Sequence, residues 1–151
     1  MRAYFWGNLY LSSIQQGIQS LHCLNEMYIK YDGHLDHTHD DVCACDQYQM
    51  LRDWGENHKT VVILNAGEMS ALDKVEELMS LADNPYPWTS WRESPESLNG
   101  ALTNVGVILP ERMYKAAHDK KKYWRNWDNR QKLTVWEIEL ADLINSTYMA
   151  R

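Results

Sequence analysis

Short runs of β-branched and aromatic residues alternate in this chain with longer segments whose apolar residues recur every three or four positions. The runs cover residues 3–6, 60–64, 88–92 and 101–109, and each has Gly, Pro or Asn at one end. Such runs predict strands, and the longer periodic segments predict helices. Because this alternation is typical of a sheet covered by helices, we predict an α/β fold with a mixed four-stranded sheet flanked by helices.

Three helices are expected between these strands. The first begins after Ser12 and ends at Gly33, and the second spans residues 47–57. The third begins at Ser70 and ends at Asn84. Ser is a preferred residue before a helix, and Gly or a following Pro stops one. The predicted inner side of the first helix consists of Ile14, Ile18, Leu21 and Tyr28.

A chain of 151 residues is long enough for one hydrophobic core. Residues 1–110 hold all four predicted strands, and residues 111–151 are predicted to form a basic, Trp-rich extension packed on them. Within the extension we expect a basic helix, an alternating stretch at 133–140 and a tail helix at 141–149. No apolar run is long enough to span a membrane, and the first residues do not resemble a signal peptide. We therefore expect a cytoplasmic protein that does not bind membranes.

Basic residues are concentrated near the C-terminus of an acidic chain. The net charge is −6, yet eight basic residues stand against three acidic ones between Glu111 and Lys132. Trp and Tyr residues lie among them, and such a mixture can contact phosphates and stack on bases. A basic helix that faces an acidic neighbour, including a second copy of the chain, would have the same composition. Both interpretations stay open.

Three His and two Cys residues lie in the polar loop between His34 and Cys45. Imidazoles and thiolates bind zinc, but the His-x-His and Cys-x-Cys spacings differ from those of common zinc sites. We favour an acidic loop without metal, and a zinc site is the alternative. Glycine-rich phosphate loops and the nucleophile elbow are absent from the sequence, so we expect no cofactor.

Polar residues crowd the segment 8–23, which follows the first predicted strand and opens the first helix. Gln15, Gln19 and His22 are spaced so that they share one helix face. Burying three such side chains without partners would be costly, and backbone N–H groups at the start of a helix attract anions. We predict a hydrogen-bonding pocket at the C-terminal end of the first strand. A polar face turned to solvent is the alternative.

This segment resembles the opening motif of the type 2 peptidyl-tRNA hydrolases, roughly Asp-Leu-x-Met-x-x-Gly-Lys-x-Ala-Ala-Gln-Cys-x-His-Ala. Aligned without gaps on residues 8–23, the motif matches at Leu9, Leu11, Gln19 and His22. Residues 99–107 are similar to the closing strand of the family, Pro-Gly-x-x-Thr-x-Leu-Gly-Ile. The resemblance covers residues 3–110 and implies the fold of that family and a site for peptidyl-tRNA.

The chain departs from the family at the residues that carry chemistry. The Lys of the motif aligns with Gln15, its first Asp aligns with Asn8, and the Asp before the last strand has only Glu93 as a substitute. A glutamine has no titratable proton, so it can position a ligand but cannot act as a general acid or base. We therefore expect a retained pocket with altered machinery.

The function predicted from these features is non-catalytic binding of a small nucleotide. Trp88 or Trp91 would stack on the base, and the start of the first helix would hold phosphate. Small phage proteins that sequester nucleotide immune signals have a similar profile, and such a protein would work in the cytoplasm of the host cell. The predicted ligand-binding residues are Asn8, Gln15, Gln19, His22, Trp88, Trp91, Arg92, Glu93, Asn99 and Thr103.

The alternative is a divergent peptidyl-tRNA hydrolase in which His22 and Glu93 took over proton transfer. In that case the basic segment would hold tRNA. The residues expected to contact it are Lys120, Lys121, Lys122 and Arg125. A third reading is a structural protein whose aromatic residues form an oligomer interface. We expect a homo-oligomer, because the family is dimeric and the extension is rich in Trp.

Overall fold

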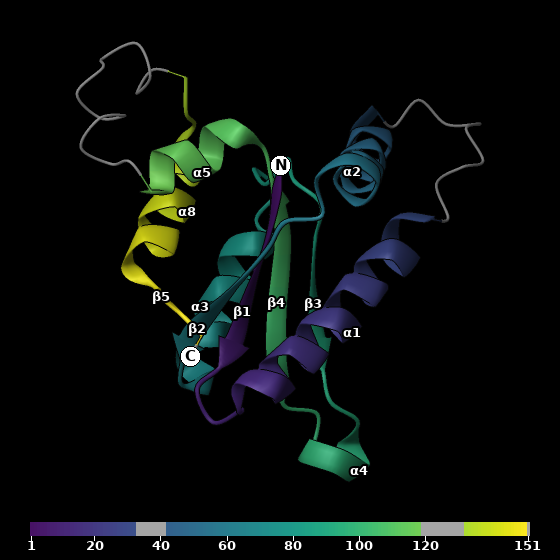
Figure 1. Ribbon diagram of the computed structural model, residues 1–151, viewed down its shortest axis with the longest axis vertical. Helices are drawn as coiled ribbons and strands as arrows, with labels where there is room; N and C mark the ends of the chain where they lie inside the picture. Colours follow the sequence, from purple (N-terminus) through teal and green to yellow (C-terminus); the bar gives the residue numbers. More distant parts are fainter. Residues whose placement is uncertain (33–41, 119–131, 151) are drawn as a thin grey trace.

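The computed structural model describes residues 1–32, 42–118 and 132–150. These residues form a five-stranded mixed sheet with helices on both faces (Figure 1). The strand order is β3-β4-β1-β2-β5. The predicted α/β class is confirmed. The prediction of four strands is wrong by one, because a short fifth strand is added at the C-terminus.

The first four strands lie where the sequence predicts them, and their bounds are β1 (Arg2–Asn8), β2 (Val61–Gly67), β3 (Trp88–Arg92) and β4 (Leu102–Leu109). β1 and β2 are parallel, and β4 runs antiparallel to both β1 and β3. The fifth strand, β5 (Tyr148–Met149), pairs antiparallel with β2. The carboxyl ends of β1 and β2 therefore meet at one edge of the sheet, beside β5.

Three of the helices in the first two thirds of the chain follow the prediction, and a further short helix was not predicted. The predicted ones are α1 (Ser13–Asp32), α2 (Val42–Asp53) with a π-helical turn η2 (Trp54–His58) and α3 (Met69–Ser80), and the one that was not predicted is α4 (Pro95–Leu98). The second helix begins five residues before the predicted start at Gln47, at Val42.

The C-terminal segment differs from the prediction. It contains α5 (Glu111–His118) and α8 (Val135–Ser146), so the stretch expected to alternate is helical. A capping box starts α8: the Thr134 hydroxyl accepts from the Glu137 N–H, and the Glu137 carboxylate accepts from the Thr134 N–H. The expected tail helix ends at Ser146, and the residues after it form β5.

Two clusters of buried residues form the core, one on each face of the sheet. α1 and α2 cover the first face, with Phe5, Met27 and Leu51 among the buried residues. α3, α5 and α8 cover the second face, where Trp136 and Leu140 of α8 join the same cluster as residues of β1 (Figure 1). The boundary at residue 110 stays a prediction. None of the helices in the described ranges has the length and apolar character needed to cross a membrane.

The predicted inner face of α1 is wrong for three of its four residues; the fourth, Tyr28, is half-buried and packs against the core on the α1 side of the sheet. Ile14, Ile18 and Leu21 are 77%, 46% and 67% exposed. The side that meets the sheet instead carries Gln16 and Ser20, which are buried, followed further along by buried apolar residues. Apolar character alone does not select this face, because the part of the sheet beneath it is polar.

Candidate functional site

One row of paired residues crosses all five strands at the carboxyl end of β1. From one edge of the sheet to the other, its members are Tyr148, Asn65, Gly7, Asn104 and Trp91. Side chains paired across neighbouring strands point to the same face of a sheet. Since Trp91 and Asn104 contact α1, the whole cross-strand row belongs to the α1 face.

A β-bulge brings two polar residues of β4 to this face. Trp91 pairs with Asn104 and Arg92 pairs with Leu102, so Thr103 is left as an extra residue. A bulge interrupts the alternation of side chains and often re-aims them beside functional sites. Here Thr103 Oγ1 donates to Gln19 Oε1 at 3.2 Å, and Asn104 Nδ2 donates to Ser20 Oγ at 3.3 Å. The bulge thus places two hydrogen-bonding side chains under α1.

The Gln19 amide is held between two partners. Its Nε2 donates to Glu93 Oε1 at 2.6 Å, and its Oε1 accepts from Thr103. Next to it the His22 imidazole stacks on the Trp91 indole, with ring centroids 4.9 Å apart and planes 17° from parallel. We call these five residues, Gln19, His22, Trp91, Glu93 and Thr103, the Gln19 cluster. All five are among the predicted ligand-binding residues.

Unpaired polar atoms are concentrated around the cross-strand row. In the described part of the chain, four buried side-chain nitrogen or oxygen atoms have no hydrogen-bond partner, and three belong to Gln16, Asn104 and Trp91. The fourth is the indole nitrogen of Trp6. Because buried polar atoms are nearly always paired in folded proteins, such a concentration indicates a place where another molecule supplies partners.

Cys23 lies beneath the same stretch of α1 but is unsuited to nucleophilic chemistry. Its thiol is buried and donates to the Thr89 carbonyl oxygen at 3.4 Å. Burial raises the pKa of the Cys23 thiol far above its usual range. The thiolate, which is the reactive form, is therefore suppressed.

Two predicted site residues lie at the entry to α1 and interact locally. The Asn8 side chain accepts from the Tyr10 N–H at 3.0 Å. The Gln15 side chain accepts from the N–H and the hydroxyl of Ser12, both at 2.9 Å. Gln15 is exposed, so it does not point with Gln19 into the cluster as its spacing predicts.

The side chains of three further predicted residues form no hydrogen bond, ion pair or ring contact with the Gln19 cluster in the described part of the chain, and these residues have other local roles. Trp88 is at the opposite end of β3, where its indole packs against the Lys30 ammonium. Arg92 points to the other face of the sheet and pairs with Glu76 of α3. Asn99 ends α4 in the left-handed conformation, with φ of 52°. Arg92 therefore has a structural partner on the face of the sheet opposite to Gln19.

The sequence prediction missed the polar residues that α1 and the sheet bury between them. Gln16 and Ser20 are 2% and 4% exposed, and Asn104 is fully buried. A signal was present, because residues 16, 20, 23 and 27 share a helical spacing. The more apolar stripe at Ile14, Ile18 and Leu21 concealed it.

Two predicted features lie outside the described residues. These are most of the His- and Cys-rich loop and the basic residues proposed to contact tRNA, Lys120, Lys121, Lys122 and Arg125. Within the described residues, no group of three His, Cys, Asp or Glu side chains is arranged to hold a metal ion.

Comparison with known proteins does not assign a function to this site. No protein-family model and no curated protein matches the chain. The functional argument therefore rests on the geometry of the Gln19 cluster and of the cross-strand row.

Proposed function

We propose that this protein binds a small nucleotide without converting it, on a scaffold like that of the type 2 peptidyl-tRNA hydrolases, and so sequesters the nucleotide. The observation that carries the proposal is the Gln19 amide, fixed between the Thr103 hydroxyl and the Glu93 carboxylate. Polar groups held in one orientation before the ligand arrives lose little entropy on binding.

The groups around Gln19 suit the parts of a nucleoside. A carboxylate such as Glu93 can accept hydrogen bonds from the two hydroxyls of a ribose, as acidic residues do in dinucleotide-binding folds. The exposed His22 ring, held flat by Trp91, offers an aromatic surface on which a base can stack. The start of α1, where backbone N–H groups favour a phosphate, precedes His22 by nine residues, roughly 14 Å along the helix axis.

The proposal of binding without catalysis rests on the groups at the start of α1. Where the family motif has Lys, this chain has Gln15, whose side-chain oxygen is used to cap its own helix. The nearby Cys23 thiol is buried and protonated. Neither residue offers a proton or a nucleophile at neutral pH.

Replacing Glu93 with Gln tests the proposal, because the change removes one charge and keeps the shape of the side chain. The purified protein is mixed with cyclic dinucleotides, ADP-ribose derivatives and common nucleotides, and filtered. Both fractions are then chromatographed after denaturation. We expect the wild-type protein to deplete one compound and release it intact, and Glu93→Gln to weaken this binding about tenfold or more.

The matched control is Glu96→Gln, which makes the same change at an exposed residue of α4. This variant is expected to bind as the wild-type protein does. Equal binding by both variants, or recovery of the compound in altered form, contradicts the proposal. A second pair, Gln19→Leu and the exposed Gln49→Leu on α2, separates the role of the amide from that of the charge.

The alternative function is peptidyl-tRNA hydrolysis. One observation favours it: the two residues proposed for proton transfer, His22 and Glu93, both belong to the Gln19 cluster. Under this hypothesis the wild-type protein cleaves peptidyl-tRNA, and His22→Ala lowers the rate about 100-fold or more, within the usual range for loss of a general acid or base. Absence of cleavage by the wild-type protein removes this alternative.

The partners and location predicted from the sequence stay predictions. They are tRNA contact through the basic segment, formation of a homo-oligomer and a cytoplasmic location. The nucleotide proposal requires none of them, because every residue of the Gln19 cluster comes from one copy of the chain.

A further inference from the structure

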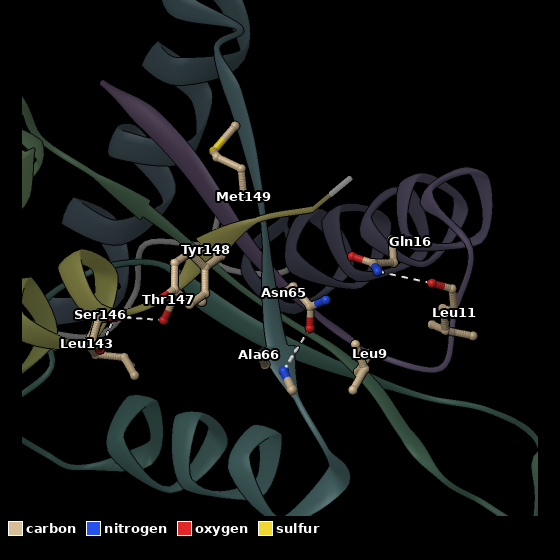
Figure 2. Close-up of a pocket in the computed structure, with 11 residues that line it drawn as sticks. Leu9, Leu11, Gln16, Asn65, Ala66, Leu143, Ser146, Thr147, Tyr148 and Met149 are labelled. Atoms are coloured by element: carbon tan, nitrogen blue, oxygen red, sulfur yellow. Dashed lines mark hydrogen bonds between the residues drawn. The ribbon is translucent and has the colours of Figure 1, made fainter.

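A cavity of about 790 Å³ lies beside the part of the cross-strand row that α1 leaves uncovered (Figure 2). α1 covers the row from Gly7 to Trp91. The remaining members, Asn65 and Tyr148, line the cavity together with Gln16. Cavities of this size hold small molecules in other proteins. The residues that line it do not include any member of the Gln19 cluster.

Gln16, one of the residues that line this cavity, has a buried hydrogen-bond acceptor without a partner among the described residues. Its side chain is 2% exposed, and its Nε2 donates to the Leu11 carbonyl oxygen at 3.1 Å. Its Oε1 has no partner among the described residues. The oxygen lies close over Gly7, where a Cβ would come within 2.9 Å of it. Glycine at position 7 therefore allows the Gln16 amide to sit against the sheet.

Asn65 brings a hydrogen-bond donor to the same space. Its Oδ1 accepts from the Gly67 N–H at 2.9 Å, across a second bulge where β1 pairs with β2. This bond turns the Nδ2 away from the strand. In Figure 2 the Gln16 oxygen points toward β2 and the Asn65 nitrogen points toward α1. An acceptor and a donor thus point into the same space between α1 and β2.

The rest of the lining is uncharged, and apart from the hydroxyl residues Ser146 and Thr147 it is mostly apolar. Leu9, Leu11 and Leu143 line the cavity, and Tyr148 offers its ring from β5. Tyr148 is 82% exposed although it is a large aromatic residue within the sheet. None of the lining residues is Asp, Glu, Lys, Arg or His. A phosphate or carboxylate group would therefore find no counter-charge on these walls.

We infer that this cavity binds an uncharged nucleobase, separately from the nucleotide at the Gln19 cluster. Every nucleobase has a ring that can stack on Tyr148 and an edge with adjacent donors and acceptors. The N–H of such an edge donates to Gln16 Oε1, and its acceptor receives the Asn65 Nδ2–H. The base thus supplies the hydrogen-bond donor that Gln16 Oε1 lacks among the described residues.

The substitution Asn65→Asp tests this inference at one atom. It keeps an oxygen for the Gly67 N–H and replaces the donor with an acceptor. Binding of adenosine, cytidine, guanosine and uridine is measured by NMR titration. We expect at least one nucleoside to bind the wild-type protein, and its binding to weaken about tenfold or more in Asn65→Asp and in Tyr148→Ala. Asn145→Asp, which adds the same charge at an exposed residue of α8, is expected to bind like the wild-type protein.

Thermal unfolding of each variant shows whether the fold is retained, and Tyr148→Ala removes an exposed side chain, so it is expected to fold. The inference is wrong if no nucleoside binds, or if Asn65→Asp binds as well as Asn145→Asp. It is also wrong if indole, a ring without the acceptor, binds as tightly as the best nucleoside. Glu93 belongs to the Gln19 cluster, whereas Asn65 lines the cavity and is not part of that cluster. Failure of this inference is therefore distinguishable from failure of the proposed function.

Discussion

Replacing Trp136 with Ala is expected to lower the free energy of unfolding by about 3–5 kcal/mol, the usual cost of removing a large buried aromatic side chain. Trp136 is 3% exposed and belongs to the core cluster shared by β1, α3 and α8. Its Nε1 donates to the Leu78 carbonyl oxygen of α3 at 2.8 Å. The substitution leaves a cavity between α3 and α8 and removes the donor for this carbonyl group.

This experiment also tests whether the C-terminal segment unfolds together with the rest of the chain. Chemical denaturation is followed by circular dichroism, with Val135→Ala as the control, because Val135 is the neighbouring residue and is 83% exposed. The control is expected to change stability by less than about 0.5 kcal/mol. A single transition that shifts in Trp136→Ala supports one cooperative unit. Two separate transitions, only one of them shifted, would contradict it.

Replacing Arg112 with Met is expected to lower the free energy of unfolding by about 2–3 kcal/mol. This is somewhat less than the loss expected for an ion pair in which both partners are buried, because solvent reaches the guanidinium of Arg112. The Glu137 side chain is 1% exposed, and that of Arg112 is 46% exposed. Arg112 is the cation paired with Glu137, and it also donates to the Tyr86 hydroxyl at 2.8 Å. The Tyr86 hydroxyl in turn donates to Glu137. Without Arg112 the carboxylate stays buried with hydrogen bonds but no counter-charge.

The same cluster influences the tyrosine between the two charges. Burial raises the pKa of Tyr86, and its hydrogen bond to the Glu137 carboxylate raises it further. Tyr86 therefore stays protonated as a donor throughout the physiological range. Burial of the Glu137 charge is tolerated in the native protein because Tyr86, Arg112 and the Thr134 N–H all donate to its carboxylate.

The double variant Arg112→Met, Glu137→Gln separates a buried charge from lost packing. Because no charge then stays buried, the double variant is expected to be more stable than Arg112→Met alone. Lys115→Met is the control, since the pair that Lys115 forms with Glu111 one turn away is exposed on both sides. We expect no measurable change for that control. If the double variant is less stable than Arg112→Met, loss of the ion pair does not explain why Arg112→Met is less stable than the wild-type protein.

The candidate site was only partly visible in the sequence. Gln19 and His22 were found because they match a motif and share a helix face, and Glu93 because of its place before the last strand of the motif. The structure brings these three together with Trp91 and Thr103. The cavity beside them was not predicted, because Tyr148 was assigned to a tail helix and Asn65 to the end of a strand.

Local patterns in the sequence by themselves determined the α/β class, the positions of β1 to β4 and the existence of α1, α2 and α3. These features depend on alternation, helical spacing and end signals, which act between residues close in the chain. The tertiary structure decided which face of α1 is buried, where the sheet bulges and that β5 joins β2. Those outcomes depend on partners far apart in the sequence, such as Gln19 and Thr103, which are 84 residues apart. A polar residue on a helix becomes part of a site only when the opposite strand presents a group that it can bond, and no local pattern contains that information.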